Sequence, residues 1–276
     1  MKKKYHIIES LKNIEHTYST YLIDVVGVIS DGKAPFNDVI EAINYLLKKD
    51  KQIIFLSNNP RPAWFTETKL RTFGITGNYH TVTSGDLLHH TLKTTLADKK
   101  IYHLGRNRQH ALLEGTNTHI TTSLSDADAI ILSCFVEGDE DHTIFDKDLE
   151  EIINSNKPIY CPNPDQLTFQ GNILRYPSGY FAHKLTQRGC PITYLGKPSR
   201  IIYDFITHIH PHINFTHDTT LMIGDTLETD ICGAINFSID SLLVLSGITG
   251  LLTKNNTHAI AQSPYQPTYI IEKLLQ

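Results

Sequence analysis

Apolar residues recur along the chain in two patterns. Short apolar runs predict β-strands, and they alternate with longer segments in which apolar residues recur at helical spacing. The predicted strands are TYLIDVV (20–26), QIIFLS (52–57), HTVTS (80–84), ADAIILS (127–133), PIYCP (158–162), TTLMIG (219–224) and DSLLVL (240–245). Strands that alternate with helices favour a parallel sheet with helices on its faces, so the predicted fold class is α/β.

The helical segments carry their own start and stop signals. Pro62 stands near the start of one of them and Gly74 is placed to end it. Ser84 and Ser199 are the predicted N-caps of two others. The predicted helices are DVIEAINYLLKK (38–49), RPAWFTETKLRTFG (61–74), SGDLLHHTLKTTLAD (84–98), SGYFAHKLTQRG (178–189) and PSRIIYDFITHI (198–209).

Polar side chains gather where several predicted strands end. Asp24 lies in the apolar run YLIDVVGVIS, and a buried carboxylate is costly unless it is paired or emerges at a strand end. Ligands of open parallel sheets bind at the carboxyl ends of the strands. The polar residues at such positions are Asp24, Ser57, Asn58, Asn59, Asp225 and Asp230, and the loop LGKPSR adds Lys197 just before a helix.

Three carboxylates, a lysine and a hydroxyl at strand ends fit a magnesium and phosphate site. An aspartate can also act as a nucleophile. Each piece alone has an ordinary structural interpretation: GDTLETD as a turn with a helix cap, SNN as a turn, and Lys197 as a solvated surface residue. Their combination, in this order, is far more specific than any one of them.

With these motifs the chain resembles the haloacid dehalogenase superfamily of phosphohydrolases. DVVGVISDG, FLSNNP, GKP and IGDTLETD are similar to its first to fourth motifs. The long insert between the second and third motifs, with LSNNPRP, CPNPD and GKPSRIIYD, resembles class IIA, which includes p-nitrophenyl phosphatases and pyridoxal phosphate phosphatase. The resemblance runs from about Tyr21 to Thr249.

The resemblance implies a Rossmann-like core with a parallel sheet, formed by residues 1–85 and 179–276, and an inserted α/β cap of the C2 type at 86–178. It implies that Asp24 is a nucleophile that forms an aspartyl-phosphate. Ser57 and Asn58 would bind phosphate oxygens, and Lys197 would balance charge on the nucleophile and on the phosphoryl group.

The resemblance also implies a metal and a substrate contact. Mg²⁺ would be bound by Asp24, the backbone carbonyl of Val26, Asp225 and, directly or through water, Asp230. The segment NPD matches the part of the cap that faces the active site, so Asn163 and Asp165 are the expected substrate contacts.

Val26 departs from the family pattern. Most phosphatases of the family have a second aspartate there, which protonates the leaving group and then activates water, whereas valine cannot move a proton. General acid–base assistance contributes about 10² to 10⁴ in rate. We therefore expect a slow phosphohydrolase that acts on a small phosphorylated metabolite.

Two alternatives follow from Val26. The protein could be a phospholigand-binding or partner-binding member that has lost turnover. Another group could also supply the acid, with Asp31 as one candidate, although Gly32 after it favours a turn residue. Members that hydrolyse phosphonates through a lysine Schiff base also lack the second aspartate, but no cap lysine can be assigned to that role.

Composition and short sequence patterns limit the partners and the location that we expect for the protein. The 276 residues are 40% hydrophobic and 20% charged with a net charge of −4, which argues against nucleic acid. No run is long enough to span a bilayer, and MKKKYHIIESLKN lacks the apolar core of a signal peptide. The four scattered cysteines favour reduced thiols in the cytoplasm. Caps of this class often take part in dimer contacts, so a homodimer is a further expectation.

The segment THIHPHINFTH contains four histidines, His208, His210, His212 and His217. Their spacing invites a transition-metal interpretation. His208 belongs to the end of a predicted helix and Pro211 interrupts the geometry, so we expect a solvated loop.

Overall fold

The computed structural model describes residues 5–105, 115–254 and 257–274. Its strands are β1 (His6–Ile7), β2 (Thr20–Ile23), β3 (Gln52–Ser57), β4 (His80–Thr83), β5 (Lys100–Leu104), β6 (His119–Thr121), β7 (Ala129–Leu132), β8 (Val136–Glu137), β9 (Ile159–Cys161), β10 (Thr168–Gln170), β11 (Ile173–Tyr176), β12 (Ile192–Tyr194), β13 (Thr220–Gly224), β14 (Asp240–Val244) and β15 (Tyr269–Ile271). Its helices are α1 (Val39–Lys48), α2 (Ala63–Thr72), α3 (Ser84–Lys93), α4 (Asp146–Ser155), α5 (Ser178–Gln187), α6 (Arg200–Ile209), α7 (Cys232–Phe237), α8 (Ile248–Thr253) and α9 (Thr257–Ala261), with a 3₁₀ turn at Leu11–Asn13 and a π-helical turn at Leu227–Ile231.

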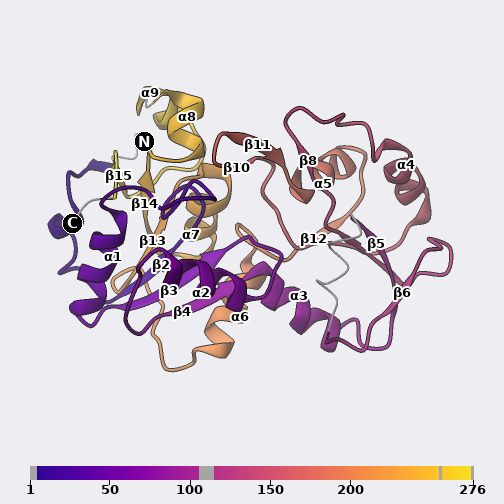
Figure 1. Cartoon of the computed structure of the whole chain (residues 1–276), viewed down its shortest axis with the longest axis horizontal. Coiled ribbons are helices and arrows are strands. Elements are labelled where there is room, and N and C mark those ends of the chain that lie inside the picture. Colours follow the sequence, from indigo (N-terminus) through magenta and orange to yellow (C-terminus); the bar gives the residue numbers. More distant parts are fainter. Residues whose placement is uncertain (1–4, 106–114, 255–256, 275–276) are drawn as a thin grey trace.

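The larger sheet has seven parallel strands in the order β1-β15-β14-β13-β2-β3-β4. Figure 1 shows it on the left of the molecule, with both ends of the chain nearby. Strand β13 lies between β14 and β2, and Ile23 is opposite Ile223. The residues that follow β2, β3, β13 and β14 therefore meet at one edge of the sheet, as predicted for an α/β fold.

Side-chain alternation along the central strands buries both faces of this sheet. Tyr21 and Ile23 of β2 pack on one face in a cluster that includes Val39, Ile43 and Leu46 of α1. Leu22 points to the other face, whose cluster includes side chains of α3 and α6. Helices on both faces explain why the strands read as continuous apolar runs.

Two smaller sheets occupy the other half of the molecule (Figure 1). One has five parallel strands in the order β12-β9-β7-β5-β6, and the other has three antiparallel strands in the order β10-β11-β8. A separate apolar cluster joins the five-stranded sheet to α4 and α5. Most elements of this part, from β5 to β11, lie within the range 86–178 of the predicted insert.

The elements of the insert differ in extent from the predicted range of 86–178. Helix α3 packs on the large sheet through Leu87, Leu88 and Leu92, although most of it lies after residue 85. At the other end, α5 packs in the core of the insert and β12 pairs with β9, although both lie after residue 177. Apolar periodicity marks a helix but does not say which of two sheets it covers.

All seven predicted strands and all five predicted helices are present, with ends shifted by up to five residues, as at α3, which ends at Lys93 and not at Asp98. Ser199 caps α6 as predicted, because its hydroxyl accepts a hydrogen bond from the backbone of Ile201 at 3.4 Å. The predicted cap of α3, Ser84, is wrong. Thr83 is the N-cap there, since its hydroxyl accepts from the backbone of Asp86 at 3.1 Å and the Asp86 carboxylate accepts from the backbone of Thr83 at 2.9 Å.

The structure also bears on the predictions about membrane spans, cysteines and the N-terminal segment. No helix among the described residues is long and apolar enough to cross a membrane. The four cysteines are free thiols. Lys2, Lys3 and Lys4, which begin the segment tested for a signal peptide, lie outside the described residues.

The segments outside the family motifs belong to the large sheet. Strand β1 pairs with β15 at its edge, and Leu11 is buried in the cluster around α1. The hydroxyl of Tyr18, which is 1% exposed, donates to the Asp240 carboxylate at 2.6 Å. This hydrogen bond ties the chain before β2 to the start of β14.

Removing the Tyr18 hydroxyl should destabilise the fold, because it leaves a partly buried carboxylate without this partner. We expect Tyr18→Phe to lower the free energy of unfolding by about 2 kcal/mol, measured by urea denaturation. Tyr194→Phe is the control, since the Tyr194 hydroxyl forms a hydrogen bond with a neutral group, the hydroxyl of Thr186, at 3.2 Å. Equal stability of Tyr18→Phe and the native protein would contradict the role of this bond.

Candidate active site

Three carboxylates converge at the carboxyl edge of the large sheet. Asp24 follows β2, Asp225 follows β13, and Asp230 lies in the π-helical turn after β13. One oxygen from each lies within 4.8 Å of the others, and all three side chains are buried. The three predicted aspartates thus lie close together because they follow neighbouring apolar strands.

The ammonium of Lys197 lies between two of these carboxylates. Its Nζ donates to Asp24 Oδ1 at 2.5 Å and to Asp230 Oδ1 at 2.7 Å. The lysine is 1% exposed, so the alternative interpretation of Lys197 as a solvated surface residue does not hold. A buried ammonium requires charged partners, and these carboxylates supply them.

The pKa values reflect this crowding. Burial raises the pKa of Asp24 to about 7, while the Lys197 ammonium opposes the shift and the Asp230 carboxylate adds to it. Burial, followed by the charges of Asp230 and Asp24, raises the pKa of Asp225 well above its usual value. Burial alone would lower the pKa of Lys197, but the two carboxylates raise it. Three carboxylates and one ammonium leave a surplus of negative charge.

Several oxygens of these carboxylates accept hydrogen bonds from the protein. Asp230 Oδ2 accepts from the backbone N–H groups of Asp225 at 3.1 Å and Thr226 at 3.0 Å, while its Oδ1 holds Lys197. Asp225 Oδ2 accepts from the backbone of Ile248 at 2.6 Å. Both oxygens of Asp230 are therefore used within the protein, which suits it to orient the loop.

Two glycines allow the chain to approach Asp225. A Cβ at Gly27 would lie 2.3 Å from Asp225 Oδ2, and one at Gly247 would lie 2.0 Å from it. Gly27 also has φ of +100°, a conformation that side chains rarely adopt. Gly27 follows β2 and Gly247 follows β14, so both restrict the position of the same carboxylate.

Asn58 links the strand ends to the insert. Its Oδ1 accepts from the backbone N–H of Lys197 at 2.8 Å, and its Nδ2 donates to the Lys197 carbonyl at 3.0 Å and to Asp165 Oδ1 at 2.8 Å. The backbone N–H of Asp165 in turn donates to Asn163 Oδ1 at 3.1 Å. The side chain of Asn58 is thus committed to protein partners, and the predicted contacts Asn163 and Asp165 lie beside it.

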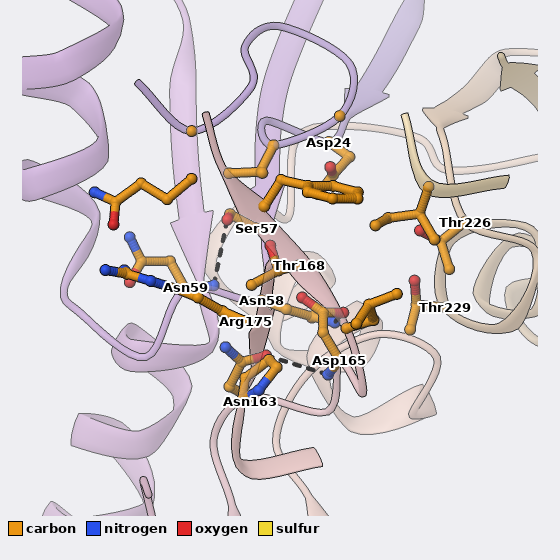
Figure 2. Close-up of a pocket in the computed structure, with 18 of the residues that line it drawn as sticks. Asp24, Ser57, Asn58, Asn59, Asn163, Asp165, Thr168, Arg175, Thr226 and Thr229 are labelled. Carbon is orange, nitrogen blue, oxygen red and sulfur yellow. Dashed lines mark hydrogen bonds between the residues drawn. The ribbon is translucent and has the colours of Figure 1, made fainter. Parts of the chain in front are cut away.

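A cavity of about 1240 Å³ opens over these groups, lined by both halves of the molecule. Figure 2 shows Asp24, Ser57 and Asn58 from the large-sheet side together with Asp165 and Thr168 from the insert. Val26 also lines the cavity. The structure therefore brings every predicted site residue to one cavity: Asp24, Val26, Ser57, Asn58, Asn163, Asp165, Lys197, Asp225 and Asp230.

Asp31, the candidate replacement acid, also lines the cavity but is held in a turn. Its Oδ1 accepts from the backbone N–H groups of Ala34 at 2.7 Å and Lys33 at 2.8 Å. These hydrogen bonds, that of Ala34 first, lower the pKa of Asp31. A carboxyl group with a lowered pKa has already lost its proton at neutral pH, so it cannot protonate a leaving group there. This supports the interpretation of Asp31 as a turn residue.

The carboxylate cluster fits a hard divalent cation. Its donors are oxygens, it is buried, and its three carboxylates exceed the single ammonium that compensates them. Ions such as Mg²⁺ prefer this donor chemistry. The same charges would be costly to bury without a cation.

Sequence reasoning missed several residues of the cavity. Ser246 and Gly247 follow the predicted strand 240–245, so the rule that found the aspartates could also have found them. Thr168 and Arg175 come from the β10–β11 hairpin, whose strands are too short to give a clear period in the sequence. No sequence signal pointed to that hairpin.

Comparison with known proteins gives the family. The model of haloacid dehalogenase-like hydrolases matches residues 21–119, and a HAD-hydrolase-like model matches residues 194–276. The chain belongs to the haloacid dehalogenase superfamily of hydrolases. The predicted family is confirmed.

Relatives match over nearly the whole chain. A 4-nitrophenylphosphatase of Schizosaccharomyces pombe is 26% identical and aligns over 99% of this chain and 98% of its own length. The 5'-nucleotidase YutF of Bacillus subtilis is 25% identical, covering 94% and 97%. A haloacid dehalogenase-like hydrolase structure from Brucella suis has a TM-score of 0.83 at 23% identity, covering 98% of this chain and all of that chain. The last similarity shows the shared fold.

Asp165 offers a test of the electrostatics of the cavity. Burial raises its pKa from 3.8 to about 6, opposed by Lys197 and by the hydrogen bond from Asn58. The folded state therefore holds this proton more tightly than the unfolded state, and it loses stability as pH rises from about 4 to about 6. Asp165→Asn keeps the acceptor for Asn58 and removes the ionisation.

We expect Asp165→Asn to match the native protein in stability near pH 4 and to exceed it by about 1 to 2 kcal/mol at pH 7, after allowance for partial solvent access. Urea denaturation across this pH range, with chelator present, measures the difference. Asp31→Asn is the control, because the pKa of Asp31 is lowered and its removal should not stabilise the protein. A pH-independent difference for Asp165→Asn would contradict the expected ionisation.

Proposed function

We propose that the protein is a Mg²⁺-dependent phosphohydrolase of class IIA that acts on a small phosphorylated metabolite through an aspartyl-phosphate. The observation that carries the proposal is the buried Asp24 carboxylate, held by Lys197 at 2.5 Å beside two further carboxylates. The names of two relatives that align over nearly the whole chain, a 4-nitrophenylphosphatase and a 5'-nucleotidase, support it.

The proposed roles follow from the contacts. Asp24 attacks phosphorus, the bond to the leaving oxygen breaks, and water later hydrolyses the acyl phosphate. Lys197 holds Asp24 in place and offsets the charge of the phosphoryl group, a positioning and electrostatic role typical of phosphoryl transfer. Ser57 contributes its hydroxyl to phosphate binding. Asn58, whose side chain is engaged, contributes its backbone N–H.

Mg²⁺ would be held by Asp24, the carbonyl of Val26 and Asp225. Asp230 would act through water, because Lys197 and two backbone N–H groups already use its oxygens. When bound, the cation would neutralise the surplus negative charge and allow an anionic phosphate to approach. Asp225 is fixed for this purpose by Ile248 and the two glycines that pack against it.

The insert acts as a C2-type cap in this proposal. Asn163 and Asp165 lie on its side of the cavity, with Asp165 joined to Asn58. The cap would thereby exclude water and contact the part of the substrate that leaves. The free thiols agree with a cytoplasmic location, which we also propose.

Val26 sets the expected limits of the activity. Without an acid at this position, a leaving group that departs as a stable anion needs no proton, whereas an alkoxide does. Aryl and acyl phosphates should therefore react faster than alkyl phosphates. The alternative, a phospholigand-binding protein without turnover, is also favoured by Val26 alone.

Phosphate release with Mg²⁺ tests the proposal. We expect the native protein to hydrolyse p-nitrophenyl phosphate and Asp24→Asn to be inactive, because the nucleophile is lost. Both proteins should show the same far-UV circular dichroism. If the two are equally inert while inorganic phosphate still binds, the protein is a phospholigand-binding member instead.

Restoring the acid gives a second prediction. Val26→Asp should raise the rate on alkyl phosphates by about 10²-fold or more and should change the rate on p-nitrophenyl phosphate much less. Val26→Asn is the matched control, since it has nearly the same shape as the aspartate but cannot donate a carboxylic proton. An equal gain on both substrate types, or an equal gain with asparagine, would argue against a missing acid.

A further inference from the structure

Three histidines gather at a place far from the carboxylate cluster. His80 is the first residue of β4, His210 caps the end of α6, and His212 lies two residues further on. One ring nitrogen of each lies within 4.8 Å of the others. The ring centroids of His80 and His210 are 4.3 Å apart, and those of His210 and His212 are 6.1 Å apart.

Only some histidines of the segment THIHPHINFTH belong to the cluster. His208 approaches His90 instead, with ring centroids 6.4 Å apart, and exposed His217 contacts the carboxylate of Asp218 at 2.6 Å. The expectation of a solvated loop therefore describes His217 but not His210, which is 9% exposed. The sequence could not reveal His80 as a neighbour, because 130 positions separate it from His210.

The surroundings suit a metal ion of intermediate softness. The cluster contains only imidazole donors, which zinc, copper, nickel and cobalt prefer and magnesium and calcium do not. His210 is buried, and the rings of His80 and His212 lie beside it. His80 is partly exposed and His212 is exposed, which leaves the site open to solvent.

The distances also allow coordination with small ring rotations. Nitrogens that bind one tetrahedral zinc ion lie about 3.3 Å apart, as follows from bond lengths of about 2.0 Å. The cluster reaches 4.8 Å at most between these atoms before any ion enters. Among the described residues, no hydrogen bond from a side chain or the backbone holds any of the three rings.

We propose that His80, His210 and His212 form a second metal site, which binds one Zn²⁺ or a similar transition-metal cation with water in the remaining position. The site is separate from the carboxylate cluster. His80 starts β4, opposite Ile54, whereas Ser57 and Thr83 mark the carboxyl ends of β3 and β4. The two sites thus lie at opposite edges of the sheet.

The proposed role is structural. The ion would join the end of α6 to the start of β4, and α6 begins just after the loop that carries Lys197. The unfolded chain does not hold His80 near His210, so the ion would bind only to the folded state. Such binding would stabilise the folded state.

Calorimetric titration with ZnCl₂, with Mg²⁺ in excess to occupy the carboxylate cluster, tests the proposal on the full chain. We expect one Zn²⁺ to bind to the native protein. His80→Asn and His212→Asn should each weaken binding by about 100-fold or more, since even outer-shell changes can cost up to that much. His217→Asn, in the same segment but outside the cluster, should bind as the native protein does.

Two further readouts separate this site from other outcomes. Zn²⁺ should raise the melting temperature of the native protein and of His217→Asn but not of His212→Asn, whose exposed position should leave folding intact. Bound Cu²⁺ should show nitrogen couplings in its electron paramagnetic resonance spectrum, which oxygen ligands do not give. Binding that persists in both His80→Asn and His212→Asn, or a spectrum without nitrogen couplings, would overturn the proposal.

Discussion

The buried ion-pair triad of Asp24, Lys197 and Asp230 is the constraint on which the rest of the site depends. Removing an ammonium from water is costly, and the carboxylates of Asp24 and Asp230, at 2.5 and 2.7 Å, compensate it directly. The three residues come from the end of β2, the loop before α6 and the turn after β13. Satisfying their charges therefore fixes three distant parts of the chain against one another.

Much of this arrangement could be predicted from the sequence. The seven apolar runs are strands, and the polar residues after them meet at one edge because parallel strands share an end. The sequence does not show as clearly which helix belongs to which half of the molecule. Helices α3 and α5 have similar apolar stripes but cover different sheets. The β10–β11 hairpin and the partnership of His80 with His210 depend on tertiary contacts that leave no local pattern.

Asn58 shows how a turn residue can unite a site. Alone, the sequence SNN is an ordinary turn, yet the single amide of Asn58 bonds both backbone groups of Lys197 and the carboxylate of Asp165. The position of the lysine and the position of the insert are thereby linked through one side chain. A shift of the insert at Asp165 would be transmitted to the loop that holds the ammonium.

The place of β13 in the sheet has a consequence for the order of folding. This strand lies between β2 and β14, although Thr20 and its partner Thr220 are 200 positions apart. During synthesis from the N-terminus, the strands of the insert, from Lys100 to Tyr194, are complete before β13 is made. We therefore expect the insert to form first on the ribosome, while the large sheet waits for its central strand and Asp24 acquires its neighbours last.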